Sequence, residues 1–431
     1  MKSRTYTQWV SDVDGRDKKS LIPRAQLRLD RIQAVLNILG NPQWFYRTVH
    51  VGGTAGKGST CTFLASIFQV AGLRTALTLS PYIKTVREKM QVNGRNIKQI
   101  QFVRVAGKIA QAERRACVRL SHFEFLLAMA FEYFRDQRVD VAVVEVGVGG
   151  RYDATNVLKP SAVILTNVGR DHMDLLGGTP LAILKEKMGI LKPKTPLVTG
   201  VFRESQEQKI SAHVRRLGIP WMRMNGDFWV RNTDVTARGT RFDFKSKQES
   251  IRSVHLGLTG TFQPANAALA IATSLQLKKD GWRITIPQIL RGCRIARIDY
   301  RFQVIHQHPL TILDAAHSPE KMRALVRSLK QCYPQKTFVA VCAVRKGKDA
   351  RAMLRLLLPA VREVILTPLQ EKTSWNPKEL LTLMPLRMRD QMHMTQDAKS
   401  ALSLARARAQ KKDGIVVTGS MYLLRELCHR P

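Results

Sequence analysis

The sequence lacks the patterns that would place this chain in a membrane or among disulfide-stabilised proteins. The six cysteines lie far apart and form no C-x-x-C pair: Cys61, Cys117, Cys293, Cys332, Cys342 and Cys428. Several lie in apolar runs, which favours buried reduced thiols over disulfides or zinc ligands. The first residues, MKSRTYTQWVSDVDG, contain no apolar signal core, and no apolar run approaches the ~20 residues that a spanning helix needs. We therefore expect a cytoplasmic protein without a membrane segment.

Acidic residues are also scarce. Asp and Glu number 33 against 70 Lys and Arg, which gives a formal net charge of +37. Such an excess can serve anionic ligands, nucleic acid or a membrane surface. The basic residues are spread along the whole chain, and RNP, zinc-finger and basic-zipper patterns are absent. A compositional habit of the source organism is the simplest interpretation of the charge, and a nucleic-acid function stays open as the alternative.

What the chain does contain is a regular alternation of strand-like and helix-like segments. Its 431 residues exceed one compact core, so two or three domains are expected. The predicted strands are 45–51, 74–80, 139–147, 161–168 and 196–201, with helices at 60–73 and 123–137. Continuous Val, Ile and Leu strands separated by helices predict a parallel sheet that is covered on both faces.

The pattern changes twice in the second half of the chain. Residues 219–262 form shorter, polar, β-like pieces, and 264–277 is a helix. A second α/β series begins near residue 300, with RFQVIHQ, LTILDAA, TFVAVCAV, EVILTPL and GIVVTGS. We therefore expect a domain boundary at about 296–300.

One glycine-rich stretch, VGGTAGKGST at 51–60, lies between a predicted strand and a predicted helix. The usual phosphate loop reads G-x-x-x-x-G-K-S/T, whereas here Gly58 separates Lys57 from Ser59 and Val51 occupies the first glycine position. A tight turn would explain the glycines but not the adjoining lysine and hydroxyls, which can bind phosphate and reach a metal. The predicted phosphate-binding residues are Gly53, Thr54, Gly56, Lys57, Gly58, Ser59 and Thr60.

The loop resembles the GT-x-GKGS/T loop of the Mur ligase superfamily, particularly of folylpolyglutamate synthases and dihydrofolate synthases, although Ala55 replaces a common asparagine. Other segments resemble motifs of these enzymes in the same order. They are LSPYIKTVREKMQVNG (79–94), SHFEFLLAMAF (121–131), VEVGVGGRYDATNV (144–157), NVGRDHMDLLGGT (167–179), KEKMGILKP (185–193), LTGTFQPANAALA (258–270), LDAAHSP (313–319) and VTGSMYL (417–423).

The resemblance implies a Mur-ligase-like α/β fold with two parts. Residues 1–298 would form an N-terminal, P-loop-type parallel-sheet domain that binds ATP, the central Mur ligase domain. Residues 299–431 would form a C-terminal, Rossmann-like α/β glutamate ligase domain. The implied cofactors are ATP and Mg²⁺, the implied substrates are L-glutamate and a folate or dihydropteroate, and the implied state is a monomer.

An ATP-dependent amide ligase converts a carboxylate into an acyl phosphate, which an amine then attacks. Charge neutralisation and positioning supply most of the catalysis, so Lys57 and metal ligands are expected to be essential. Glu145 ends the apolar strand VAVVE, where it is either a solvated carboxylate or, given the glycines that follow, a metal ligand. The resemblance implies a first metal site at Ser80 and Glu145, within reach of Ser59, and a second that involves His172.

Lys187 is by composition one more lysine on a helix, where an exposed charge is the simplest reading. The matching family motif implies that carbon dioxide carbamylates this lysine, which then supports the metal site as an anion. The reaction requires a neutral amine and hence burial or nearby cations.

Further nucleotide contacts follow from the resemblance. Gln263 and Asn266 match the NA motif of the nucleotide pocket. Arg301 matches an arginine that reaches the terminal phosphates, and Asp314 and His317 match contacts to the ribose or metal and to the base or phosphates. Lys348 and Asp349 resemble a K-D pair of the same region.

The sequence leaves two other functions open. A Mur-type ligase could act on another carboxylate, such as a peptidoglycan precursor or a cyanophycin-like polymer, because Ala55, Tyr82 and Ser318 depart from the folate pattern. A basic nucleic-acid-binding protein on an inactive ligase fold would have lost the catalytic residues, yet all of them are present. The sequence also leaves open whether dihydrofolate synthesis, polyglutamylation or both occur.

Overall fold

The computed structural model describes residues 4–16, 29–169, 173–371 and 373–428. The chain forms two compact units. The first comprises Met1–Arg231, Asp243–Val254 and Ala265–Ala296, and the second comprises Asn232–Phe242, His255–Pro264 and Arg297–Pro431. Each unit has its own mainly parallel sheet.

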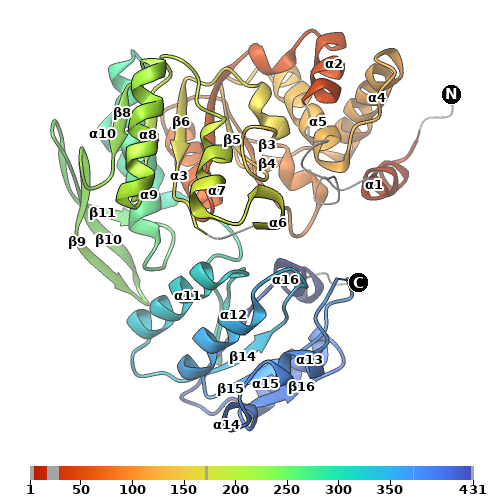
Figure 1. Cartoon of the computed structure of the whole chain (residues 1–431), viewed down its shortest axis with the longest axis vertical. Helices are drawn as coiled ribbons and strands as arrows, with labels where there is room; N and C mark the ends of the chain where they lie inside the picture. Colours follow the sequence, from red (N-terminus) through yellow and green to blue (C-terminus); the bar gives the residue numbers. More distant parts are fainter. Residues whose placement is uncertain (1–3, 17–28, 170–172, 372, 429–431) are drawn as a thin grey trace. The chain divides into compact units, whose positions relative to one another are not determined.

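Within the described residues, the first unit is built on an eight-stranded sheet of order β4-β3-β2-β5-β1-β6-β7-β8. Figure 1 labels β3, β4, β5, β6 and β8 of this sheet and helices that lie around it. The strands are β1 (Arg47–Gly52), β2 (Thr75–Thr78), β3 (Gln91–Val92), β4 (Arg95–Asn96), β5 (Val141–Glu145), β6 (Ala162–Leu165), β7 (Leu197–Thr199) and β8 (Trp221–Arg223). Strands β2, β5, β1, β6, β7 and β8 pair in parallel, whereas β3 pairs antiparallel with β2 and with the edge strand β4. The predicted parallel sheet is therefore confirmed.

Helices cover this sheet on both faces, as expected for buried parallel strands. The helices of this unit are α1 (Tyr6–Asp14), α2 (Asp30–Ile38), α3 (Lys57–Val70), α4 (Gln99–Arg115), α5 (His122–Asp136), α6 (Met173–Leu176), α7 (Pro180–Met188), α8 (Glu204–Leu217), α9 (Gln263–Lys279, from Ala265 onward) and α10 (Ile286–Ile295), with short 3₁₀ turns η3 (Pro42–Trp44), η4 (Val86–Lys89) and η5 (Ala154–Val157). Helix α3 packs on β1, β2 and β5, and α10 packs on α3.

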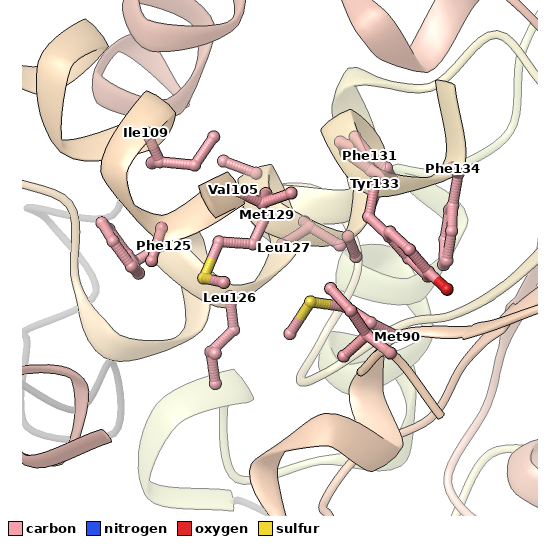
Figure 2. Packing of buried hydrophobic residues seen from close by; sticks show 14 of the residues in the cluster. Met90, Val105, Ile109, Phe125, Leu126, Leu127, Met129, Phe131, Tyr133 and Phe134 are labelled. Carbon is pink, nitrogen blue, oxygen red and sulfur yellow. The ribbon is translucent and has the colours of Figure 1, made fainter. Parts of the chain in front are cut away.

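A large apolar cluster of this unit lies between the sheet and the pair α4 and α5. Figure 2 shows its centre, to which α4 contributes Val105 and Ile109 and α5 contributes Phe125, Leu126, Leu127, Met129, Phe131, Tyr133 and Phe134. Alternate residues of β5, Ala142 and Val144, complete it from the sheet side. Each fully buried phenylalanine contributes on the order of 2–3 kcal/mol to folding, so this cluster stabilises the packing of α4 and α5 on the sheet.

A separate three-stranded sheet of order β11-β10-β9 follows β8 within the described residues. Its strands are β9 (Phe228–Thr236), β10 (Gly239–Ser246) and β11 (Ser250–Leu256). Burial alternates along β10, where Phe242 and Phe244 are buried between more exposed neighbours. This is the pattern of a sheet with one solvated face, and it confirms the polar β-like pieces predicted for 219–262.

The second unit contains a six-stranded sheet of order β12-β13-β17-β14-β15-β16 within the described residues. Its strands are β12 (Gln303–Gln307), β13 (Leu310–Leu313), β14 (Phe338–Cys342), β15 (Glu363–Leu366), β16 (Met392–Met394) and β17 (Gly414–Thr418). Its helices are α11 (Pro319–Cys332), α12 (Ala350–Leu357), α13 (Pro377–Thr382), α14 (Leu386–Arg389), α15 (Ala398–Arg408) and α16 (Met421–Cys428), with η6 (Leu358–Ala360). All neighbours pair in parallel except β12, which pairs antiparallel with β13.

Helices lie on both faces of this second sheet as well. Ala340 and Cys342 of β14 join an apolar cluster with α11 and α12. The alternate residues Val339 and Val341 are also buried and point to the opposite face, where α15 packs against β14 and β15. The doubly covered parallel sheet confirms the α/β fold predicted for the C-terminal part.

The absence of membrane-spanning helices and the state of the cysteines were also predicted from the sequence. No helix among them is long and apolar enough to cross a bilayer. Five cysteines in this part of the chain are free, of which Cys61, Cys293, Cys332 and Cys342 are buried and Cys117 is exposed. Buried reduced thiols are thus found at all of these positions except Cys117.

Candidate active site

The carboxyl ends of four neighbouring strands, β2, β5, β1 and β6, meet at one edge of the first sheet. In the register of these strands, Val51 of β1 lies beside Glu145 of β5, and Gly52 lies beside Leu165 of β6. Polar residues follow each strand end at this edge. This is the position at which open α/β sheets bind ligands.

The glycine loop leaves β1 at Gly52 and enters α3 at Lys57. Gly53 has φ +140° and Gly56 has φ +84°, conformations that residues with a Cβ rarely adopt. A Cβ on Gly53 would lie 1.9 Å from the Thr166 hydroxyl, and one on Gly56 would lie 2.3 Å from Asn266 Oδ1. Both glycines are therefore required, and the unpaired N–H groups at the start of α3 form an anion-binding cradle.

Two lysines converge on one carbonyl oxygen beneath this loop. Lys57 Nζ donates to Gly53 O at 3.1 Å, and Lys187 Nζ donates to the same oxygen at 2.8 Å. Lys57 Nζ also lies 4.0 Å from Glu145 Oε1. Lys187 is only 4% exposed, so an ordinary surface lysine is excluded at this position.

Glu145 and Ser80 are joined directly. The backbone N–H of Ser80, two residues beyond β2, donates to Glu145 Oε2 at 2.8 Å. Lys89 Nζ donates to Ser80 Oγ at 2.7 Å and to Leu79 O at 3.3 Å, and it lies 4.6 Å from the centre of the Phe123 ring. Burial lowers the pKa of Lys89 from 10.5 to about 8, although Glu145 and then Asp153 oppose this shift.

The oxygen atoms at this edge match the chemistry of a magnesium site. Ser59 is buried in the first turn of α3, and Ser80 and Glu145 lie beside the loop. Hydroxyl and carboxylate oxygens are the hard ligands that Mg²⁺ prefers, and Mg²⁺ commonly takes few protein ligands together with phosphate. Among the described residues, no group of three or more His, Cys, Asp or Glu could hold a metal. The predicted ligand His172 lies outside the described residues.

The first turn of helix α9 contains the two residues of the predicted NA motif. Gln263 and Asn266 are both buried and lie one turn apart. The Asn266 carbonyl accepts the hydroxyl of Thr60 at 3.4 Å. Together with the close approach of its side chain to Gly56, this contact places Asn266 against the phosphate loop.

In the second unit, Asp314 follows β13 and accepts two backbone N–H groups. Its Oδ2 accepts from Phe302 and its Oδ1 from Ala316, each at 2.8 Å. Burial raises the pKa of Asp314 from 3.8 to about 6, while Arg301 and these two hydrogen bonds oppose the shift. Arg301 and Asp314 are thus close enough to interact electrostatically.

His317 lies in the same loop in a defined arrangement. Its Nδ1 is 2.8 Å from the Ala315 carbonyl and its Nε2 is 2.8 Å from Lys321 Nζ. Because a carbonyl only accepts and an ammonium only donates, Nδ1 carries the proton and Nε2 is the acceptor. Ser318, which replaces the family asparagine, caps α11 with its hydroxyl, and Asp349 similarly caps α12.

Comparisons with known proteins identify the family of this chain. The Mur ligase middle domain matches residues 51–274, and the Mur ligase glutamate ligase domain matches residues 300–421. Folylpolyglutamate synthase of Lacticaseibacillus casei is 35% identical over 401 residues, which cover 91% of this chain and 92% of that protein. The chain belongs to the folylpolyglutamate synthase and dihydrofolate synthase family of Mur ligases.

Solved structures of this Mur ligase family have the same fold. Mycobacterium tuberculosis folylpolyglutamate synthase complexed with ADP matches with a TM-score of 0.91 at 28% identity, over 99% of this chain and 98% of that one. E. coli FolC in complex with DHPP and ADP matches with a TM-score of 0.88 at 25% identity, over 99% and 97% of the two chains. The Mur-ligase-like fold predicted from the sequence is confirmed.

In this Mur ligase, the structure brings together Lys57, Ser80, Glu145 and Lys187 through the contacts above, and it links Asn266 to the loop. Sequence reasoning assigned no role to Lys89, which contacts Ser80, or to Thr166 and Asn167, which contact the loop. It also assigned none to Lys321, which contacts His317. Asn167 had a usable signal, because it is a polar residue shortly after a buried strand. Lys89 replaces an arginine of the matching family segment, which gave it no role by itself, and nothing in the sequence distinguished Lys321 from other lysines.

Proposed function

We propose that the protein is an ATP-dependent ligase that joins L-glutamate to the carboxylate of a folate, of dihydropteroate, or of both. One observation carries this proposal: the glycine loop, Lys57 and the Ser80–Glu145 pair lie at one edge of the sheet. This arrangement provides a phosphate cradle beside a carboxylate and a hydroxyl, in a chain that aligns with nearly the whole of a folylpolyglutamate synthase.

The reaction proceeds in two displacements. A substrate carboxylate oxygen attacks the γ-phosphorus of ATP, the bond to the bridging oxygen breaks, and ADP leaves with the electron pair. The neutral amine of glutamate then attacks the acyl carbon, loses its proton, and phosphate leaves as the amide forms. Both steps concentrate negative charge on phosphate oxygens, which cations and N–H groups stabilise.

Residue roles within the first unit follow from the contacts. The N–H groups of Gly56, Lys57, Gly58 and Ser59 at the start of α3 would bind phosphates, and Lys57 would exchange its contact with Gly53 for a phosphate oxygen. The N–H groups of Thr54 and Thr60 are already donated to the carbonyls of Asn167 and Gly56, so these two residues would shape the loop. Ser59, Ser80 and Glu145 would hold Mg²⁺, which when bound neutralises charge on the phosphates. We assign His172 to a second metal position by its family motif alone.

The proposal extends to the nucleotide contacts, the roles of the two domains, the oligomeric state and the compartment. Gln263, Asn266, Arg301, Asp314 and His317 are assigned to nucleotide binding. Residues 1–298 would act as the ATP-binding domain and 299–431 as the glutamate ligase domain. A monomer is proposed, and free thiols such as Cys61 and Cys293 favour a reducing, cytoplasmic compartment.

Lys187 is proposed to act as a carbamate. Its amine is buried and shares the Gly53 carbonyl with Lys57. Carbamylation would replace one of two like charges at this oxygen by an anion, which favours a nearby cation.

The acceptor assignment draws on relatives. The L. casei relative is named folylpolyglutamate synthase, and E. coli FolC is described in complex with DHPP and ADP. These names support a pterin-bearing acceptor and an adenine nucleotide for this chain.

The test is ADP release in the presence of ATP, Mg²⁺ and L-glutamate with each of three acceptors: dihydropteroate, tetrahydrofolate and a UDP-muramyl precursor. The Lys57→Ala variant serves as the blank. Stimulation by either pterin supports the proposal and identifies which activity is present. Stimulation by the muramyl compound alone would keep the ligase chemistry and overturn the folate assignment.

A further inference from the structure

Two side chains of the segment that follows β6 form hydrogen bonds with the backbone of the phosphate loop. Thr166 Oγ1 donates to the Ala55 carbonyl at 2.6 Å, and Asn167 Nδ2 donates to the same oxygen at 3.1 Å. Asn167 Oδ1 in turn accepts the Ala55 N–H at 2.9 Å. The amide of Asn167 thus pairs with both polar groups of a residue that lies 112 positions away in the sequence.

Three further contacts extend this attachment along the loop. The Thr54 N–H donates to the Asn167 carbonyl at 3.0 Å, and the Gly169 N–H donates to Thr54 Oγ1 at 3.1 Å. The Thr166 N–H donates to the Gly52 carbonyl at 3.0 Å. The loop is therefore fixed from outside on both sides of Gly53.

Thr166 also fills the space that a side chain at position 53 would need. Its hydroxyl lies 1.9 Å from the position of a Cβ on Gly53, and Thr166 is only 3% exposed. The hydroxyl is therefore buried and aimed at the loop. Because Ala55 has no polar side-chain group of its own, the backbone at this position depends on Thr166 and Asn167 for its orientation.

We propose that Asn167 and Thr166 are positioning residues of the nucleotide site. They hold the peptide groups around Ala55 in the one orientation in which the loop N–H groups converge on an anion. A loop that is ordered in advance loses less conformational entropy when phosphate binds. The inference rests on the proposed function only in that this loop takes the phosphates of a nucleotide.

The test uses the full chain and measures the dissociation constant of a fluorescent ADP analogue without folate or glutamate. Asn167→Ala removes both contacts of the amide and should weaken binding about tenfold or more, as expected for one to two lost hydrogen bonds. Thr166→Val keeps the side-chain shape and should weaken binding about threefold to tenfold. Thr166→Ser restores the hydroxyl and should bind as the wild type does.

Steady-state kinetics separate positioning from general damage. In Asn167→Ala the KM for ATP should rise by the same factor as the dissociation constant, whereas the KM for glutamate should stay unchanged. Asn167→Asp keeps an acceptor for the Ala55 N–H but places a carboxylate oxygen against the Ala55 carbonyl and a negative charge beside the loop, so it should bind the nucleotide no better than Asn167→Ala does.

Thr199→Val is the matched control. Thr199 ends the neighbouring strand β7, is 1% exposed, and uses its hydroxyl to accept the Trp221 indole N–H at 3.0 Å. This variant should lose stability without losing nucleotide affinity. Nucleotide affinity within twofold of the wild type in both Asn167→Ala and Thr166→Val, or equal weakening in Thr199→Val, would overturn the inference. Normal ADP binding without folate-dependent turnover would overturn the folate assignment alone.

Discussion

The backbone N–H of Ser80 donates to Oε2 of Glu145 at 2.8 Å, which joins the chain after β2 to the end of β5. The two strands are neighbours, with Thr78 beside Val144 in the parallel register. Glu145 Oε1 faces Lys57 Nζ at 4.0 Å. The carboxylate of Glu145 thus links the segment around Ser80 to the phosphate loop, because one oxygen accepts the Ser80 N–H and the other faces Lys57.

Glu145→Gln keeps a hydrogen-bond acceptor for Ser80 but removes the charge. We expect kcat to fall about 100-fold or more, because a preorganised charge at a phosphoryl-transfer site is lost, and the Mg²⁺ concentration required for half-maximal activity to rise. The control is Glu132→Gln, since Glu132 is also buried but pairs with Lys108 and Arg135 away from the loop. The measurement is a Mg²⁺ titration of ADP release. Equal kcat in the wild type and Glu145→Gln would refute the metal assignment.

Gly56 and Gly72 form a natural pair for a second prediction, because both have φ +84°. A Cβ on Gly56 would displace Asn266, whereas a Cβ on Gly72 would have no atom within 4 Å. Gly72→Ala should therefore cost only backbone strain, about 1–2 kcal/mol, and leave the KM for ATP unchanged. Gly56→Ala should cost at least as much stability and also raise the KM for ATP about tenfold or more. Equal KM values for ATP in the two variants would contradict the structure of the loop.

The role of Lys187 can be tested by chemical rescue. Lys187→Ala should lower kcat about 100-fold, and added formate should restore part of the activity if the residue acts as a carbamate anion. Lys185→Ala, an exposed position on the same helix α7, should behave as the wild type. Rescue by methylamine and not by formate would show that Lys187 acts as a cation instead.

His50 predicts a specific acid sensitivity. It is fully buried, its Nε2 lies 2.8 Å from Thr155 Oγ1, and the Thr155 hydroxyl donates to Asp153 Oδ1. Nε2 therefore carries the proton, and among the described residues Nδ1 has no hydrogen-bond partner. Burial lowers the pKa of His50 from 6.5 to about 4, although Asp153 opposes the shift.

Because the unfolded chain takes up the proton first, the free energy of unfolding should decrease as the pH falls from about 6.5 to about 4. The total loss from this group is about 3 kcal/mol. Urea unfolding at a series of pH values should show this slope in the wild type and in the exposed-site control His306→Gln. His50→Gln should lack it; parallel curves for all three proteins would rule His50 out as the cause.

Much of the fold and part of the site can be predicted where local sequence determines local structure. The run VAVVE predicts a buried strand with Glu145 at its end, and β5 ends there. Helix 60–73 was predicted with the right length but begins at Lys57 and ends at Val70. The positive φ values of Gly56 and Gly72 set these limits, and hydrophobic periodicity does not register them.

Other site features depend on contacts between distant segments, which one sequence does not reveal. The sequence suggests an exposed lysine at position 187 of a helix. In the structure this side chain is buried, because α7 directs its amine to the Gly53 carbonyl. Lys89 ends the 3₁₀ turn η4, and the fold of residues 80–89 brings its amine back to the hydroxyl of Ser80. Asn167 and Thr166 act on the phosphate loop because β6 is the neighbour of β1 in the sheet, an order that the chain sequence alone does not specify.

The most direct measurement follows isotopes through the complete reaction. The protein is incubated with ATP, Mg²⁺, L-glutamate labelled with carbon-13, and a folate acceptor whose reacting carboxylate carries oxygen-18. Mass spectrometry should find the labelled glutamate in a new amide, and one oxygen-18 atom in the released phosphate for each amide formed. A labelled amide with unlabelled phosphate would contradict the acyl-phosphate route, and ADP formation without a labelled amide from either folate or dihydropteroate would contradict the proposed function itself.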